Sequence, residues 1–168
     1  ENPVALRLQM SFLFNEESVV ENLLQEEALI NIKIITMAAP QRMFYSAIWM
    51  IQLLHKKIVP KNVGQTYKKH VRVALKQFKK YTQYAPSNFE HLYYLLKAEY
   101  SRYVGKISSA KLYYDRAIQL AGFNGFLCDK ALSNRCAALF YEQLNERQRA
   151  EEYMQQAVEI LKKWGAYR

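Results

Sequence analysis

The sequence predicts an all-α protein, built as a right-handed superhelix of about four antiparallel helix pairs. Three observations lead to this prediction. Apolar side chains recur at three- and four-residue steps through most of the chain, which is the spacing of one helix face. The chain has only five glycines and four prolines, and they fall between the periodic segments. Part of the pattern also recurs after forty residues, which is typical of stacked helix pairs.

Eight helical segments follow from the periodicity and the turn residues. They span about 3–13, 16–37, 41–58, 65–84, 88–104, 107–121, 126–144 and 147–163. The breaks hold residues that favour turns or helix ends, namely Asn15, Pro40, the 60–64 stretch, Pro86, Gly105, the 122–125 stretch and Asn145. We expect Ser87 or Asn88 to cap the segment after Pro86. We interpret residues 1–168 as one domain and, because the chain opens on Glu1 and not on Met, as a fragment of a larger protein.

A forty-residue repeat joins two stretches of the C-terminal half. Ala98, Gly105, Ala110, Tyr114 and Ala117 recur as Ala138, Asn145, Ala150, Met154 and Ala157, with identical spacings. In both sets a turn residue separates two helices, and small residues stand where the helices are expected to cross. A weaker copy opens the chain at Asn15, Val20 and Leu24. Coincidence between two degenerate patterns is the alternative interpretation.

Short motifs spread over the same half point to a family. They are PSNFEH at 86–91, AE at 98–99, YYDRAI at 113–118, AGFNGF at 121–126, ALSN at 131–134, FY at 140–141 and WGA at 164–166. Together they resemble the terminal TPR-like region of large multidomain signalling proteins, in which a kinase-like domain and an AAA-type ATPase precede this region and sensor histidine-kinase modules follow it. The resemblance is loose over residues 1–85. It implies a TPR-like solenoid, and the family's ATP-binding and catalytic motifs lie outside such a region.

No pattern typical of catalysis occurs in the sequence. There is no glycine-rich phosphate loop, no Gly-x-Ser-x-Gly elbow and no His-Glu-x-x-His metal spacing. His55, His70 and His91 fall on three separate predicted helices, and we interpret His70 as a solvated residue of a basic face. We therefore expect a protein that is not an enzyme and that holds no cofactor and no metal.

The two cysteines and the hydropathy predict the compartment. Cys128 and Cys136 are eight residues apart on one predicted helix, roughly 12 Å along its axis, which is too far for a disulfide. We expect two buried free thiols and a cytoplasmic location. No apolar run approaches the roughly 20 residues that a membrane span needs.

Charge is distributed unevenly along the chain, whose formal net charge is +9. No acidic residue occurs between Glu27 and Glu90, whereas eleven lysines and arginines do, nine of them within residues 56–80. On the predicted helix at 65–84 the apolar side chains take one face and the cations take the remainder. The basic patch of this helix comprises Lys68, Lys69, Arg72, Lys76, Lys79 and Lys80.

Two interpretations of the basic patch stay open. It is either a solvated face, which faces an acidic neighbouring domain or keeps the chain in solution, or a binding surface. The binding surface would take a phosphate-bearing partner, nucleic acid or an anionic membrane surface. The absence of an arginine-rich or glycine–aromatic signature weighs against nucleic acid.

Tyrosine is the second compositional anomaly, with thirteen copies. The tyrosines either pack between repeats or line a groove, since tyrosine anchors interfaces. In helix-pair solenoids the concave side is the extended binding surface, and we assign it to the first helix of each pair. The partner-binding residues expected from this register are Arg42, Tyr45, Trp49, Glu99, Arg102, Tyr103, Arg135 and Glu142.

Two functions from different classes follow. The first is a non-catalytic protein–protein interaction and scaffolding module of a signal-transduction ATPase or kinase, which binds a protein partner or neighbouring domains of its own chain. It predicts that replacing Arg102 and Tyr103 by alanine weakens binding without unfolding the domain. The alternative is a module that binds an anionic partner, nucleic acid or an acidic surface, through the basic belt at 56–80. It predicts binding that falls steeply with salt.

Overall fold

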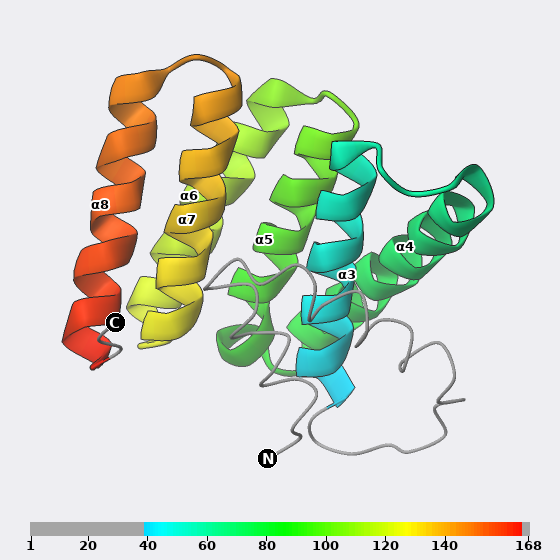
Figure 1. The fold of residues 1–168 in the computed structure, drawn as a ribbon. Helices are drawn as coiled ribbons and strands as arrows, with labels where there is room; N and C mark the ends of the chain where they lie inside the picture. The colour runs from blue at the N-terminus through cyan, green and yellow to red at the C-terminus, as the bar shows by residue number, and fades with distance from the viewer. Residues whose placement is uncertain (1–38, 166–168) are drawn as a thin grey trace. The chain divides into compact units, whose positions relative to one another are not determined.

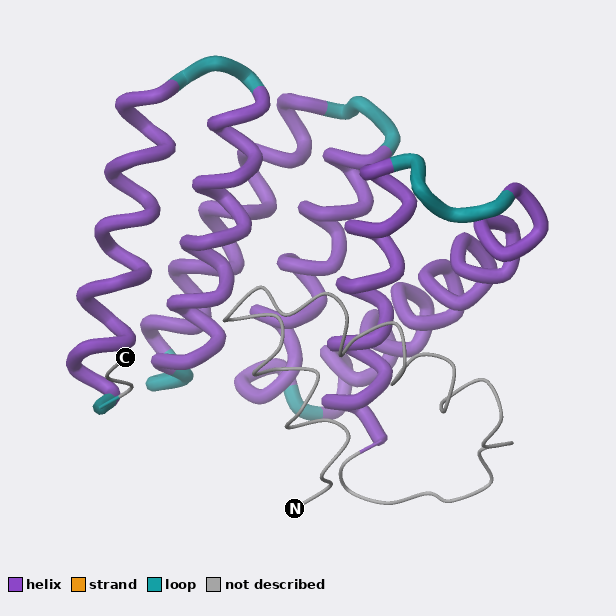
Figure 2. The backbone as a smooth tube through the Cα atoms, viewed as in Figure 1, coloured by secondary structure: helices purple, strands orange, loops and turns teal. Residues whose placement is uncertain are grey.

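The computed structural model describes residues 39–165, which belong to two compact units, residues 1–74 and 75–168. Throughout the described range the chain is helical and contains no strand (Figures 1 and 2). The helices are α3 (Ala39–Lys56), α4 (Lys61–Tyr84), α5 (Pro86–Tyr103), α6 (Ile107–Phe123), α7 (Leu127–Gln143) and α8 (Arg147–Trp164). The all-α prediction is confirmed for this range. The predicted helices at 3–13 and 16–37 lie outside it.

Three predicted helix starts are wrong. α3 begins at Ala39 and not at 41, so Pro40 lies in its first turn. Gly64 was placed in a turn, but α4 begins at Lys61, and the Gly64 amide donates a helical hydrogen bond of 2.8 Å to the Pro60 carbonyl. α5 begins at Pro86, because the fixed φ of proline suits the first helical position. Ala85 is therefore the N-cap residue, without a side-chain hydrogen bond, and the predicted caps lie inside the helix.

The turns of the second unit share one backbone conformation. Gly105, Gly125, Asn145 and Gly165, spaced twenty residues apart, have φ of 79°, 78°, 58° and 88°. After each of the first three, the next amide donates to a carbonyl five residues back, at 2.8, 2.9 and 3.0 Å, as in a Schellman motif. Helices of 17 or 18 residues thus alternate with three-residue turns, which reproduces the predicted forty-residue helix pair.

The conformation of Asn145 gives a first prediction. Replacing Asn145 by alanine should lower the free energy of unfolding by about 1 kcal/mol, because a Cβ without a compensating side-chain hydrogen bond disfavours positive φ. Replacing it by glycine should leave stability unchanged or slightly raised. Thermal unfolding of both variants checks this, and equal melting of the two would contradict the shared turn conformation.

Sequential helices of the second unit pack on one another. α5 packs on α6, α6 on α7 and α7 on α8, and α5 also reaches α7 (Figure 1). Ala98, Ala110 and Ala117 are fully buried, as expected for small residues at helix crossings. At the end of α4, the Phe78 ring contacts Phe89 of α5 edge to face, with centroids 6.2 Å apart. The Tyr81 ring contacts the same Phe89 in a tilted arrangement, with centroids 5.1 Å apart.

In the first unit, α3 and the start of α4 bury an apolar face that includes Val71 and Ala74. The prediction of a solvated His70 is wrong. Its Nε2 lies 3.2 Å from the Ser46 hydroxyl, and the imidazole is partly buried. Burial lowers the pKa of His70 below its ordinary value of 6.5.

The depressed pKa of His70 makes stability depend on pH. The unfolded chain binds a proton near pH 6.5 while the folded chain resists it, so this contribution to stability is present above that pH and is lost below it. The unfolding midpoint should fall as the pH drops from about 7 to about 5, and His70→Gln should flatten this part of the profile. An unchanged profile in the variant would refute the assignment.

Candidate functional site

The eight residues predicted to bind a partner fall into buried and accessible groups. Tyr45, Trp49, Glu99 and Arg102 are buried, whereas Arg42, Tyr103 and Arg135 are half-buried and Glu142 is exposed. A buried side chain offers almost no surface to a partner. The four buried residues are thus poorly placed to contact a partner, whereas binding by the accessible residues stays a prediction.

Glu99 and Arg102 belong to a buried polar cluster that joins three helices. Glu99 of α5 is 1% exposed, and its Oε1 accepts a hydrogen bond of 2.5 Å from the Tyr114 hydroxyl of α6. The same oxygen lies 3.6 Å from Nη1 of Arg102. The Arg102 guanidinium reaches α7, donating to Oε1 of Gln143 at 2.8 Å and to the Leu139 carbonyl at 3.4 Å.

Burial keeps the Tyr114 hydroxyl and the Cys136 thiol protonated. Burial first, and then the Glu99 carboxylate, raises the pKa of Tyr114 well above its ordinary value, so Tyr114 remains a hydrogen-bond donor. The same two causes raise the pKa of the buried Cys136 thiol. A thiol that stays protonated is a poor nucleophile, which indicates that Cys136 is structural. Neither Cys128 nor Cys136 forms a disulfide, as predicted, but only Cys136 is buried, whereas Cys128 is half-buried.

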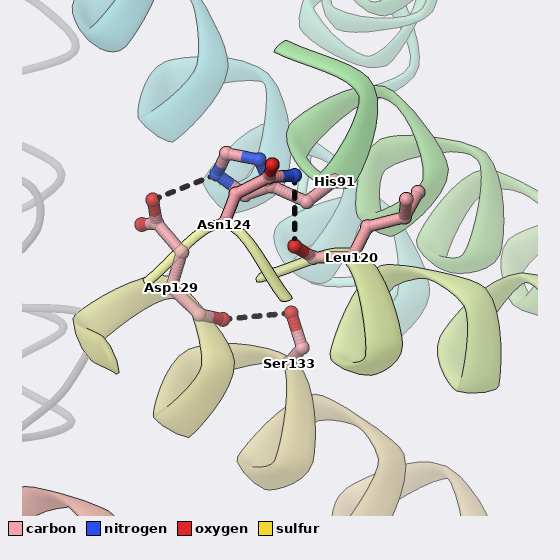
Figure 3. A network of polar contacts seen from close by, with 5 residues as sticks. All are labelled: His91, Leu120, Asn124, Asp129 and Ser133. Atoms are coloured by element: carbon pink, nitrogen blue, oxygen red, sulfur yellow. Dashed lines mark hydrogen bonds and ion pairs between the residues drawn. The ribbon is translucent and has the colours of Figure 1, made fainter. Parts of the chain in front are cut away.

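α7 is also fixed at its two ends. At its start, Asp129 Oδ2 lies 3.0 Å from Nε2 of His91 on α5, whose ring stacks on Phe126 at 4.5 Å. Figure 3 shows the Asp129 carboxylate facing His91 while its main-chain carbonyl accepts from Ser133. The other end of α7 is held by Arg102 at Gln143, and in the turn beyond it Lys111 Nζ of α6 donates at 2.7 Å to Glu146, the N-cap residue of α8.

Between these polar contacts the Phe140 ring of α7 packs on the Tyr114 ring of α6, with centroids 5.2 Å apart. α7 thus lies on a surface made by the preceding pair. Three contacts with α7 define that surface, namely His91 with Asp129, Arg102 with Gln143 and Tyr114 with Phe140. The contact of Lys111 with Glu146 extends it to the start of α8.

The last helix pair leaves the equivalent surface open. Tyr114 is 0% exposed beneath α7, whereas Met154, forty residues later, is 38% exposed. Ala110 is fully buried, whereas its equivalent Ala150 is only half-buried. A pocket of about 640 Å³ occupies this place. We call it the end face, and its lining residues are Ala138, Glu142, Asn145, Arg147, Ala150, Glu151 and Met154.

Equivalent alanines should respond differently to enlargement. Ala110→Leu should lower the free energy of unfolding by about 1–3 kcal/mol, because the new side chain overpacks a closed helix crossing. Ala150→Leu should cost much less, because its side chain extends toward the open end face. Urea unfolding of the two variants checks this, and equal losses would mean that the end face is closed.

The basic patch lies along α4. Lys69, Arg72, Lys76, Lys79 and Lys80 are exposed, and Lys68 is half-buried. Opposite them, Val71, Ala74 and Phe78 are fully buried, so the helix is amphipathic as predicted. The exposed cations can therefore meet an anionic partner or water.

From Ala39 to Gly165, no three His, Cys, Asp or Glu side chains are grouped so that they could hold a metal ion. Over the same range, no helix combines the length and the apolarity that a bilayer crossing requires.

Comparisons of the chain with models of protein families, with curated proteins and with solved structures find no match.

Proposed function

We propose that the chain is a non-catalytic protein–protein interaction module that binds a helix of its partner on the end face. The observation that carries this proposal is the forty-residue equivalence. α5 and α6 use one surface to bind α7, and α7 and α8 leave the corresponding surface open, with Met154 exposed where Tyr114 is buried. An amphipathic helix laid into an apolar groove is an established mode of recognition.

The wider setting of the proposal is a TPR-like solenoid with a right-handed superhelical course, which scaffolds signalling next to ATPase or kinase domains in the cytoplasm. The recurring turns and the contact between α5 and α7 support a stack of helix pairs. The pair of forty residues is longer than the 34 residues of a TPR, so the term TPR-like describes the architecture.

A peptide copied from the chain itself tests the proposal. A fluorescent peptide with the sequence of residues 126–146 contains α7 and should bind the full chain in an anisotropy titration. Met154→Glu should abolish binding, because it places a charge in the apolar centre of the end face. Leu112→Glu is the matched control, since Leu112 is an exposed apolar residue of α6 outside the end face.

The two variants give a clear decision. Loss of peptide binding in Met154→Glu, with binding retained in Leu112→Glu, supports docking on the end face. Binding that survives Met154→Glu would place the peptide elsewhere, and no binding to the unaltered chain would reject the proposal. Circular dichroism of each variant verifies that the fold is retained.

The second candidate function is binding of an anionic partner by α4. The observation that favours it is the exposure of five cations of the basic patch in an interval free of acidic residues. Binding of a single-stranded oligonucleotide should weaken steeply with salt, and further when Lys69, Arg72 and Lys76 become glutamate. Flat salt dependence would reject this function.

A further inference from the structure

We infer that the partner helix accepted by the end face is basic at its C-terminal end and neutral at its start. The inference rests on the proposed function, because it assumes that the partner lies on α7 and α8 as α7 lies on α5 and α6. It follows from a comparison of the residues of α5 and α6 that contact α7 with the residues that stand forty positions later in the last pair.

Two cations hold the end of α7 and the turn that follows it, and both are replaced by acids in the last pair. Arg102 donates to Gln143, and Lys111 donates to Glu146. Forty residues later, Glu142 stands at the position of Arg102 and Glu151 at that of Lys111. Both glutamates line the end face. A partner in the pose of α7 and the turn after it must therefore present donors at the places of Gln143 and Glu146, and lysine or arginine supplies them.

At the start of the partner helix the last pair offers no imidazole. His91, which faces Asp129 of α7, has Ala131 as its equivalent in the last pair. An acidic residue in the place of Asp129 would therefore have no partner there. At the centre, Met154 replaces Tyr114, and an aromatic residue in the place of Phe140 would gain a sulfur–aromatic contact.

The helix dipole favours the same charge pattern. The C-terminal end of an α-helix carries a partial negative charge, so cations in its last turn stabilise it. Gln143 lies in the last turn of α7. A lysine at the corresponding position of the partner helix would interact favourably with the dipole of that helix and with Glu142 of the end face. Arg147, at the position of Ile107, opposes the two glutamates, which leaves one net negative charge among the lining residues.

A second copy of the chain does not fit this surface as well. A two-fold pairing brings the same patch of both copies together, so residues near the axis meet their own counterparts. Glu142 and Glu151 of one copy would then approach the same acids of the other copy, and like charges disfavour such an interface. The observations therefore favour a helix of another protein with lysine or arginine at its end.

Two peptides and two forms of the protein test the inference. One peptide has the sequence of residues 126–146, and the other carries Asp129→Ala, Gln143→Lys and Glu146→Lys. The unaltered chain should bind the basic peptide about ten-fold more tightly, through two new charge pairs. The chain with Glu142→Arg and Glu151→Lys, which restores the residues of the preceding pair, should prefer the unaltered peptide.

Each outcome has a defined meaning. Reversal of the preference between the two proteins supports the inference, provided that circular dichroism shows equal helicity of the peptides. Equal affinities that Met154→Glu abolishes would overturn the basic partner but retain the end face as a helix-binding site. No binding of either peptide would reject the proposed function as well. Concentration-dependent dimerisation that Met154→Glu abolishes would assign the end face to a second copy and overturn the inference.

Discussion

Replacing Arg102 by alanine is expected to lower the free energy of unfolding by about 3–5 kcal/mol, because it leaves the buried Glu99 carboxylate without its counter-charge. The guanidinium also supplies the hydrogen bonds to Gln143 and to the Leu139 carbonyl, so α5 loses polar contacts to α7. Urea unfolding followed by circular dichroism measures the change.

Arg116→Ala is the matched control for this prediction. Arg116 is exposed on α6 and hydrogen-bonds only along its own helix, to Gln119. The control should change stability by no more than about 0.5 kcal/mol. Similar small losses in both variants would mean that the Glu99 pair contributes little. A large loss at Arg102 also means that the double replacement of Arg102 and Tyr103 cannot test binding alone, since it disturbs the core.

The second large effect is expected at Tyr114. Replacing it by alanine removes the largest fully buried side chain of α6 and should cost about 3–5 kcal/mol, as for other buried aromatic residues. Tyr114→Phe keeps the ring against Phe140 but removes the hydroxyl that donates to Glu99, and should cost about 1–3 kcal/mol. Comparison of the two variants separates the contribution of ring packing to the free energy of unfolding from that of the hydrogen bond.

Denaturant unfolding of both Tyr114 variants provides the measurement. The alanine variant should be less stable than the phenylalanine variant, and both should be less stable than the unaltered chain. If the two variants lose the same amount, the ring contributes nothing beyond its hydroxyl, and the packing of α7 on Tyr114 has been overstated.

The helices and turns of the second unit could be predicted because their signals are local. Gly105 and Asn145 stand at positions that need a positive φ, and few residue types tolerate it. The start of α4 could not be placed in the same way. Gly64 signals a turn by type, but the Gly64 amide bonds to Pro60 within the helix. The start of α5 carried a readable signal in Pro86, which suits a first helical position.

Burial of charged residues was not predictable from helical periodicity alone. Glu99 and Arg102 are polar by type, and only the neighbouring α6 and α7 supply the hydroxyl and the amide that satisfy them. The sequence of α7 did indicate that this helix is buried on several sides, because small residues are frequent in its middle. Its residues from Ala131 to Asn134 and from Cys136 to Ala138 are buried on successive sides of the helix.

The residues of the end face could be aligned from the sequence, but their exposure could not be predicted. The forty-residue alignment pairs Tyr114 with Met154, but the alignment does not say which of the two is covered. Covering depends on the next helix, and the structure places α7 over Tyr114 and leaves Met154 exposed. The exchange of Arg102 for Glu142 could have been read from the same alignment as a change of charge at equivalent positions.

The most direct test of the account uses the methyl group of Met154. The chain has five methionines, and of those in the described range only Met154 lines the end face. A methyl NMR spectrum of the methionine-labelled chain, titrated with the basic peptide, reports contact at this residue. The account predicts a progressive shift of the Met154 signal while Met43 and Met50 stay in place. An unmoved Met154 signal at saturating peptide would contradict it.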